Sequence, residues 1–75
     1  MTETAQEDTV WVEVNGERRS IRAGCSISAM LSEIGIDPRR VAVERNLEVV
    51  PRSTLDAVQV ADGDAFEIVH FVGGG

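Results

Sequence analysis

The sequence predicts a two-layer α+β domain, in which one helix covers one face of a mixed sheet of four to five strands. Three observations predict it. The chain has 75 residues, which suits one small domain. Short runs of alternating apolar residues, separated by tight-turn dipeptides, are typical of strands. One segment alone has the apolar spacing of an amphipathic helix.

The first two strands are expected at residues 10–14 and 17–22. Valine occupies every second position of the first run, the period-two pattern of a half-buried strand. Asn15 and Gly16 then supply the positive φ angles of a two-residue hairpin turn. In the returning strand, Ile21 lies on the face opposite Arg18, Ser20 and Arg22, so this segment predicts a hairpin with one buried face.

A short helix is expected after the hairpin. Ser26 can cap the free backbone N–H groups of its first turn, Gly35 stands where a left-handed C-terminal cap is usual, and Pro38 prevents continuation. The apolar stripe consists of Ile27, Met30, Leu31 and Ile34. A helix of this length is not stable alone, so the stripe must be buried on the sheet.

Residues 40–45 are expected to form a third strand, followed by a turn at Asn46 and Leu47. A short fourth strand then ends at Pro51, and a proline there suits an edge position. With valines 41 and 43 pointing inward, Ala42 and Glu44 point outward.

The segment before the last strand is expected to be loop-like. Ser53 could cap a single helical turn that directs Leu55 and Val58 into the core. The run Asp62-Gly63-Asp64 predicts a solvated turn, and residues 65–72 predict the last strand.

This order of elements is the β-grasp, or ubiquitin-like, layout. We expect three regions: a disordered N-terminal extension over residues 1–9, a β-grasp domain over residues 10–72, and a flexible glycine tail over residues 73–75.

The composition excludes several classes of protein. The net charge of −6 disfavours binding to nucleic acid, which requires neutralisation of phosphates, and favours a partner with a basic docking face. All seven basic residues are arginine, so no side chain can form a Schiff base. A single cysteine allows no internal disulfide, which fits the cytoplasm. No apolar run approaches the ~20 residues of a membrane span.

The free protein is expected to be a monomer.

Two residues invite a catalytic interpretation that their surroundings do not support. Cys25 precedes the helix, where backbone dipoles can lower a thiol pKa, but the sequence has no second cysteine to resolve an intermediate. His70 has no neighbouring nucleophile, orienting group or further metal ligand. We expect Cys25 to be a half-buried structural residue and His70 a strand residue at a sheet end, with no catalytic residue and no metal site in this chain.

The phase of the last strand predicts a contact surface. The charge of Glu67 should point to solvent, so Val69 and Phe71 on the same face should also be exposed, beside the outward-facing Ala42. An exposed apolar patch next to the tail is typical of a contact surface. The alternative is that Phe71 folds back over the end of the sheet.

The three terminal glycines, Gly73, Gly74 and Gly75, indicate carrier chemistry. Without side chains they form a thin thread that reaches about 10 Å when extended, which suits a narrow channel in another protein. The α-carboxylate of Gly75 is a poor acyl donor until it attacks the α-phosphorus of ATP and becomes an acyl-adenylate. The chain has no motif for binding Mg²⁺ and phosphates. A partner must therefore use the MgATP, this chain binds no cofactor, and it is the carried substrate rather than an enzyme.

Four segments together resemble the ThiS family of sulfur carrier proteins in thiamine biosynthesis: "VNG", "VAVERNLEVVPRS", "DGD" and "EIVHFVGGG". The resemblance covers residues 10–75. It implies that an E1-like adenylating enzyme adenylates Gly75, that a persulfide from a cysteine desulfurase or sulfurtransferase converts it to a thiocarboxylate, and that thiazole synthase receives the sulfur. Gly74 and Gly75 match the family's diglycine.

The resemblance also places Val69, Phe71 and Val72 in the partner-facing surface. Two residues depart from the family pattern. Leu47 stands where many members have glycine, and because leucine disfavours positive φ, this turn is expected to differ. Cys25 has no family role that we expect.

Alternative functions share the fold. The small subunit of molybdopterin synthase uses the same chemistry, but that family tends to have a proline-rich stretch before its diglycine, where this chain has "HFV". Carriers for tRNA thiolation or cysteine synthesis, and a ubiquitin-type protein conjugator, also remain open. A non-covalent β-grasp binding module is a further class, in which deletion of Gly74 and Gly75 would leave partner binding unchanged.

Overall fold

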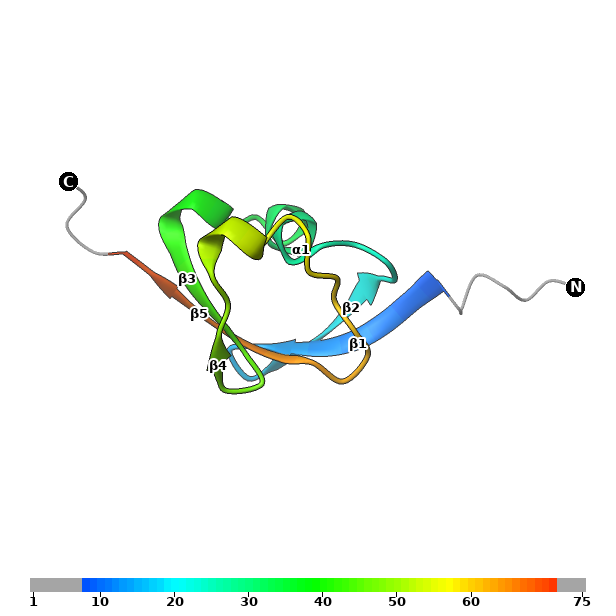
Figure 1. The fold of residues 1–75 in the computed structure, drawn as a ribbon. Coiled ribbons are helices and arrows are strands. Elements are labelled where there is room, and N and C mark those ends of the chain that lie inside the picture. Colours follow the sequence, from blue (N-terminus) through cyan, green and yellow to red (C-terminus); the bar gives the residue numbers. More distant parts are fainter. Residues whose placement is uncertain (1–7, 72–75) are drawn as a thin grey trace, which may run out of the picture.

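The structure, a computed structural model, describes residues 8–71 of the chain. Figure 1 shows one twisted sheet with the helix and the 3-10 turns gathered over one of its faces. The predicted tail and Val72 lie outside the described residues, as does the predicted N-terminal extension up to residue 7. The elements are β1 (Thr9–Val14), β2 (Glu17–Arg22), α1 (Ile27–Glu33), η2 (Pro38–Arg40), β3 (Val41–Arg45), β4 (Glu48–Val49), η3 (Arg52–Thr54) and β5 (Ala65–His70).

The sheet confirms the predicted fold class. Its strand order is β2-β1-β5-β3-β4, so the first and last strands of the domain are neighbours at its centre. They pair in parallel, whereas β1–β2, β3–β5 and β3–β4 pair antiparallel. Strand β1 begins at Thr9, one residue before the predicted start, and β5 ends at His70, two residues before the predicted end.

Helix α1 forms where its apolar stripe and its caps predict it. The Ser26 hydroxyl accepts a hydrogen bond from the Ala29 N–H at 3.0 Å. At the other end, Gly35 has a φ of +90°, and the Ile36 N–H donates to the Leu31 carbonyl at 2.8 Å. These contacts satisfy backbone groups that a helix end leaves free.

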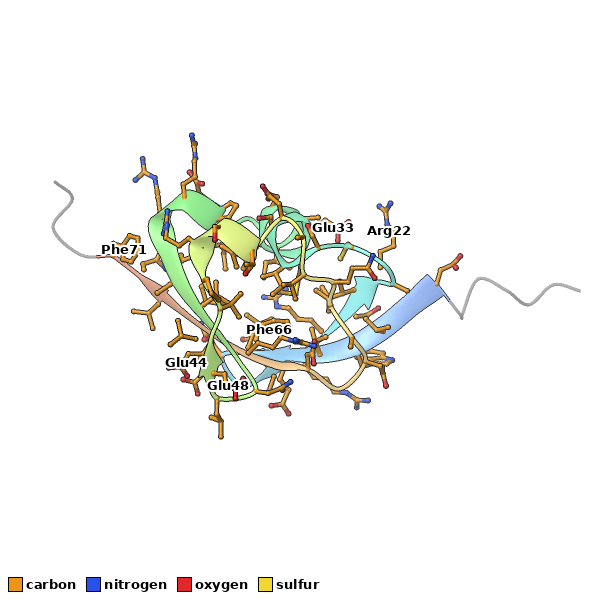
Figure 2. All side chains as sticks on the ribbon, viewed as in Figure 1. Arg22, Glu33, Glu44, Glu48, Phe66 and Phe71 are labelled. Atoms are coloured by element: carbon orange, nitrogen blue, oxygen red, sulfur yellow. The ribbon has the colours of Figure 1, made fainter. Side chains whose placement is uncertain are left out.

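The core lies between α1 and the sheet. Its buried side chains come from every strand except β4, from α1 and from the segment before β5, which covers the same face (Figure 2). They are Val12, Val14, Ile21, Ile27, Met30, Leu31, Val41, Val43, Leu55, Val60, Phe66 and Ile68. Phe66 and the three helix residues are almost completely buried, so the burial of apolar surface on one face of the sheet holds the two layers together.

The segment before β5 differs from its prediction in one respect. Leu55 is buried and Val58 is half-buried, as expected. Ser53, however, does not cap a helical turn: it lies inside η3, whose N-cap position is Pro51 and has no side-chain capping bond. The backbone of this segment instead caps α1, because the Leu55 carbonyl accepts from the Ser28 N–H at 3.0 Å. Backbone hydrogen bonds with the first turn of α1 therefore hold this segment in place.

The turn between β3 and β4 is a regular two-residue turn, contrary to the expectation drawn from Leu47. Asn46 has a φ of 52° and Leu47 a φ of 73°, so both are left-handed. The Asn46 N–H donates to the Ala65 carbonyl at 2.8 Å, and the Asn46 side-chain oxygen accepts from the Ala65 N–H at 2.9 Å. These bonds to the start of β5 fix the turn and force Leu47 into a conformation that leucine rarely adopts.

Asp64 is buried, although the sequence predicted a solvated turn around it. Its carboxylate accepts hydrogen bonds from Arg45 Nε at 2.9 Å, Asn46 Nδ2 at 3.1 Å and the Ala61 N–H at 2.9 Å. Burial acts to raise the pKa of Asp64, but the hydrogen bonds from Ala61, Arg45 and Asn46 outweigh it and hold the pKa below its usual range. The carboxylate is therefore a structural anchor between β3 and β5.

Candidate partner-facing site

The exposed face of the sheet carries the predicted apolar patch beside the end of β5. Val69 and Ala42 lie directly opposite each other on β5 and β3, and both are exposed. Val69 is 62% exposed. The helix covers the other face of the sheet (Figure 1), so nothing in residues 8–71 covers this pair. Both placements confirm the predicted phase of these strands.

Acidic residues border the apolar pair. Two residues along the strands, on the same face of the sheet, Glu44 lies directly opposite Glu67. Val49 of β4, 73% exposed, lies opposite Glu44 on its other side. Like charges at opposing positions destabilise a sheet. A partner with basic side chains would neutralise both carboxylates, so this arrangement fits the basic docking face that the net charge predicts.

Phe71 is exposed, as predicted, although it also contacts a side chain of η3. The residue is 56% exposed, so it is not folded into the core. Its N–H donates to the Arg40 carbonyl at 3.0 Å, and the guanidinium of Arg52 lies over its ring at 5.3 Å from the centroid. Phe71 therefore adds exposed apolar surface one residue beyond the end of β5. His70, next to it, is an exposed strand residue at the sheet end, as predicted.

Cys25 is the structural residue that the sequence predicts. It is half-buried and packs against the hydrophobic core. Burial, and then the negative charge of Glu33, raise the pKa of the Cys25 thiol, despite opposing effects of a backbone hydrogen bond and Arg22. A raised pKa lowers the thiolate fraction, which is the reverse of what a nucleophilic cysteine needs.

The remaining site residues of the sequence prediction are Val72, Gly73, Gly74 and Gly75, and all four lie outside the described residues. Within residues 8–71, no three His, Cys, Asp or Glu side chains come together in a way that could hold a metal ion. No helix in this part of the chain is long and apolar enough to cross a membrane.

Two features of the site were not predicted from the sequence. The outward phase of Glu44 and Glu67 could be read from each strand, but their direct opposition depends on the register between β3 and β5. The position of Arg52 over Phe71 has no local signal, because these residues approach only when η3 packs beside the sheet.

These observations define the class of the protein as a ubiquitin-like β-grasp domain, with an exposed apolar patch on the outer face of the sheet beside the end of β5. The family model for ThiS matches residues 6–75, and the chain therefore belongs to the ThiS family.

Relatives of similar size support this assignment. The sulfur carrier protein ThiS of Bacillus subtilis is 40% identical over 50 residues, which are 67% of this chain and 76% of that protein. A crystal structure of the thiamine biosynthesis protein ThiS from Geobacter metallireducens superposes with a TM-score of 0.72 at 35% identity, covering 88% of this chain and 100% of that one. The fold and the family thus agree.

The chain is also similar to part of two much larger proteins. A thiazole synthase of Paramagnetospirillum magneticum is 55% identical over 62 residues, and one of Magnetococcus marinus is 44% identical over 64 residues. The matches include 83% and 85% of this chain but only 19% and 20% of those proteins. Each of these two proteins therefore contains a ThiS-like region as about a fifth of its chain.

Proposed function

We propose that this ThiS-family chain is a sulfur carrier for thiazole formation in thiamine biosynthesis, with Gly75 as its sulfur-bearing residue. The observation that carries the proposal is the family match, which extends to residue 75 and so includes the three glycines. The match to the Bacillus subtilis sulfur carrier supports it. On this proposal the chain is a carried substrate, not an enzyme, and acts in the cytoplasm.

The proposed chemistry takes place at the carboxylate of Gly75. In the active site of an E1-like adenylating enzyme, a carboxylate oxygen attacks the α-phosphorus of MgATP and pyrophosphate leaves. The terminal sulfur of a persulfide, held by a cysteine desulfurase or sulfurtransferase, then attacks the acyl carbon and displaces AMP. A thiol finally reduces the resulting acyl disulfide and leaves a thiocarboxylate on Gly75. The partner enzyme, not this chain, binds the MgATP.

We propose thiazole synthase as the acceptor of the sulfur. The similarity to a fifth of two thiazole synthases supports this, because a carrier region joined to its acceptor would have a high effective concentration at the acceptor site. A separate carrier must find the same acceptor by diffusion.

The proposed contact surface for these partners consists of Val69, Phe71, Val72 and Ala42. The exposure of Val69, Phe71 and Ala42 supports it, as does the acidic border formed by Glu44 and Glu67. The apolar centre supplies buried area on association, while the charged border selects a basic partner face.

The direct test is the intact mass of the protein after incubation with MgATP, the adenylating enzyme of the same organism and a persulfide donor. We expect one terminal oxygen to be replaced by sulfur. A variant that lacks Gly74 and Gly75 is the control: it should keep its fold and acquire no sulfur. A wild-type protein that remains unmodified would refute the carrier function.

A second step identifies the pathway. The thiocarboxylate form is incubated with thiazole synthase and its substrates, and in parallel with the large subunit of molybdopterin synthase and its substrate. We expect the protein to return to its carboxylate mass in the first reaction only. Sulfur transfer only in the second would replace the thiamine assignment with the molybdopterin one.

A further inference from the structure

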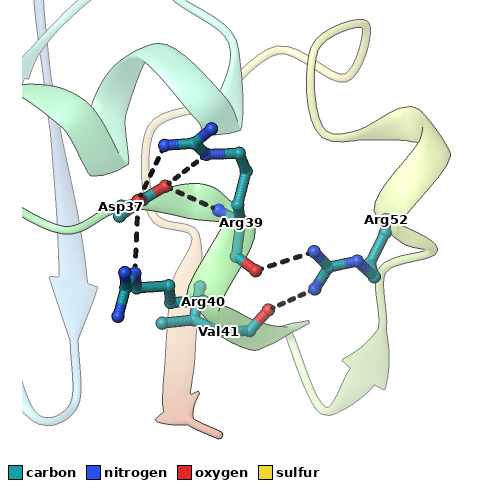
Figure 3. A network of polar contacts seen from close by, with 5 residues as sticks. All are labelled: Asp37, Arg39, Arg40, Val41 and Arg52. Atoms are coloured by element: carbon teal, nitrogen blue, oxygen red, sulfur yellow. Dashed lines mark hydrogen bonds and ion pairs between the residues drawn. The ribbon is translucent and has the colours of Figure 1, made fainter. Parts of the chain in front are cut away.

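One edge of β3 is covered by a side chain instead of a strand. Strand β4 is two residues long and pairs only with Glu44 and Arg45, after which the Val50 N–H donates to the Val43 carbonyl at 2.9 Å. Beyond that point, the Arg52 guanidinium donates to two carbonyls of the same edge, at 3.1 Å to Val41 and 2.8 Å to Arg39 (Figure 3). The guanidinium supplies the two N–H donors that a neighbouring strand would supply.

The opposite edge of this segment holds Phe71. The carbonyl of Arg40, between the two carbonyls that Arg52 binds, accepts a hydrogen bond from the Phe71 N–H at 3.0 Å. The same Arg52 guanidinium lies over the Phe71 ring at 5.3 Å, within the range of a cation–π interaction. Arg52 therefore acts on Phe71 in two ways, directly through the ring and indirectly by fixing the segment that binds the Phe71 backbone.

The charges around the segment leave Arg52 available for this contact. Asp37 pairs with the other two arginines, at 3.2 Å to Arg39 and 3.6 Å to Arg40 (Figure 3). Its carboxylate also accepts from the Arg39 N–H at 2.9 Å, which anchors the start of the segment. Arg52 has no ion pair with a carboxylate of residues 8–71, so its guanidinium can bind carbonyls and stack on the ring.

Phe71 is the last residue before the four that end in Gly75. Four extended residues reach at most about 14 Å, and glycine allows many backbone conformations. A reacting group at the end of such a segment reacts faster when the residue from which the segment starts is held in place. Fewer unproductive orientations then compete with the reactive one.

We propose that Arg52 is a positioning residue for the reaction at Gly75: it holds Phe71 and so fixes the point and direction from which the glycines enter the partner's active site. This inference rests on the proposed carrier function and extends it to a residue in η3, far from the glycines in sequence. Arg52 itself touches no reacting atom.

The test compares Arg52→Met, Arg52→Lys and Phe71→Leu with the wild type, using Arg22→Met as a matched control. Arg22 is an exposed arginine whose side chain pairs with Glu33 at 3.4 Å, away from the β3 edge. The first measurement is steady-state formation of pyrophosphate by the adenylating enzyme, with kcat and KM obtained for each variant. The second is the hydrogen-exchange rate of the Phe71 amide, compared with that of Ile68 in the same strand.

We expect Arg52→Met to lower kcat about tenfold with little change in KM, since Val69 and Ala42 at the centre of the proposed contact surface are unchanged. Arg52→Lys keeps a positive charge over the Phe71 ring but loses the paired hydrogen bonds to the two carbonyls. Its kcat should lie between those of the wild type and Arg52→Met. Phe71→Leu should lower kcat. Adding Arg52→Met to Phe71→Leu should lower kcat by a smaller factor than adding Arg52→Met to the wild type. The Phe71 amide should exchange faster in Arg52→Met, while the exchange rate of the Ile68 amide stays unchanged. In the Arg22→Met control, both amides should exchange as in the wild type.

Three results would overturn the inference: an unchanged kcat in Arg52→Met, a rise in KM alone, or a lower kcat with an unchanged Phe71 amide. A rise in KM alone would make Arg52 a direct contact of the partner. Failure of the wild type itself to be adenylated is a separate outcome, because it refutes the carrier function before Arg52 is considered.

Discussion

The side-chain amide of Asn15 forms two hydrogen bonds with the backbone of Ile68, a residue 53 positions later in the chain. The Asn15 side-chain oxygen accepts from the Ile68 N–H at 2.8 Å, and its Nδ2 donates to the Ile68 carbonyl at 3.3 Å. The parallel ladder between β1 and β5 ends at Val14 and Phe66. Asn15 thus extends that ladder with its side chain while its own backbone makes the hairpin turn, at a φ of 52°.

Replacing Asn15 should therefore destabilise the domain. Asn15→Ala loses both hydrogen bonds and also disfavours the left-handed φ, so we expect the free energy of unfolding to fall by about 2–3 kcal/mol. Asn15→Gly removes the bonds but tolerates the turn, and should cost about 1–2 kcal/mol. Urea denaturation measures both values. A glycine variant as stable as the wild type would show that the two bonds contribute nothing.

The buried carboxylate of Asp64 should make the fold sensitive to acid. Its pKa is lowered in the folded state, so its contribution to stability is fully present above its unfolded pKa of about 3.9 and is lost as pH falls through the folded value. Asp64→Asn should lower the free energy of unfolding at pH 7 by about 1–3 kcal/mol and flatten its decline below pH ~4. Denaturation curves between pH 7 and pH 2 measure this, with the exposed Asp56→Asn as control. An equally steep decline in Asp64→Asn would contradict the assignment.

Leu47 should be a site where substitution stabilises the protein. Its φ of 73° is costly for leucine, and its side chain is 86% exposed, so it gains little from packing. Asparagine tolerates this conformation, and we expect Leu47→Asn to raise the free energy of unfolding by about 0.5–1 kcal/mol. Leu47→Gly also relieves the strain but increases the entropy of the unfolded chain, so it should gain less. If the melting temperature of Leu47→Asn fell, Leu47 would have a packing role in solution.

Val69 should be required for association with the adenylating enzyme but not for folding. Val69→Arg places a positive charge in the apolar centre of the proposed surface, against a basic partner face. We expect binding to weaken by about 10- to 100-fold, with a change in melting temperature of a few degrees at most. Calorimetry or biolayer interferometry measures the affinity. Ser20→Arg, exposed on strand β2 at the far edge of the sheet, should bind as the wild type does; equal losses in both variants would mean that the effect is one of charge alone.

The pairing of Glu44 opposite Glu67 should lower the stability of the domain and speed its association with a basic partner. Glu67→Gln removes a like-charge pair, so we expect the domain to gain about 0.2–1 kcal/mol. The same change should slow association with the adenylating enzyme and weaken the dependence of the association rate on salt. Stopped-flow kinetics at two ionic strengths would show this. An association rate that is unchanged at both would remove Glu67 from the docking surface.

Features that depend on neighbours along the chain could be predicted from the sequence. The valines of β1, the Asn15-Gly16 turn and the apolar stripe of α1 each interact within a few residues, so their pattern contains the information needed. The outward phase of Val69 and Ala42 follows from the strict alternation of side chains in a strand. The family resemblance, confirmed by the ThiS match, supplied the expected chemistry of the glycines.

Features that depend on distant residues required the tertiary structure. Leu47 adopts a left-handed φ because Asn46 is bonded to Ala65, and Asp64 is buried because the same packing brings Arg45 to its carboxylate. Local preference opposed both outcomes, and the hydrogen bonds formed when β3 and β5 pair outweigh it.

The sequence and the tertiary structure likewise decided different parts of the proposed contact surface. The sequence by itself determined which side chains of β3 and β5 face solvent, because alternation is a property of a single strand. The tertiary structure alone decided that Glu44 opposes Glu67 and that Arg52 covers the β3 edge over Phe71. Register and the packing of a loop beside a sheet are set by interactions between segments, and no periodicity within one segment records them.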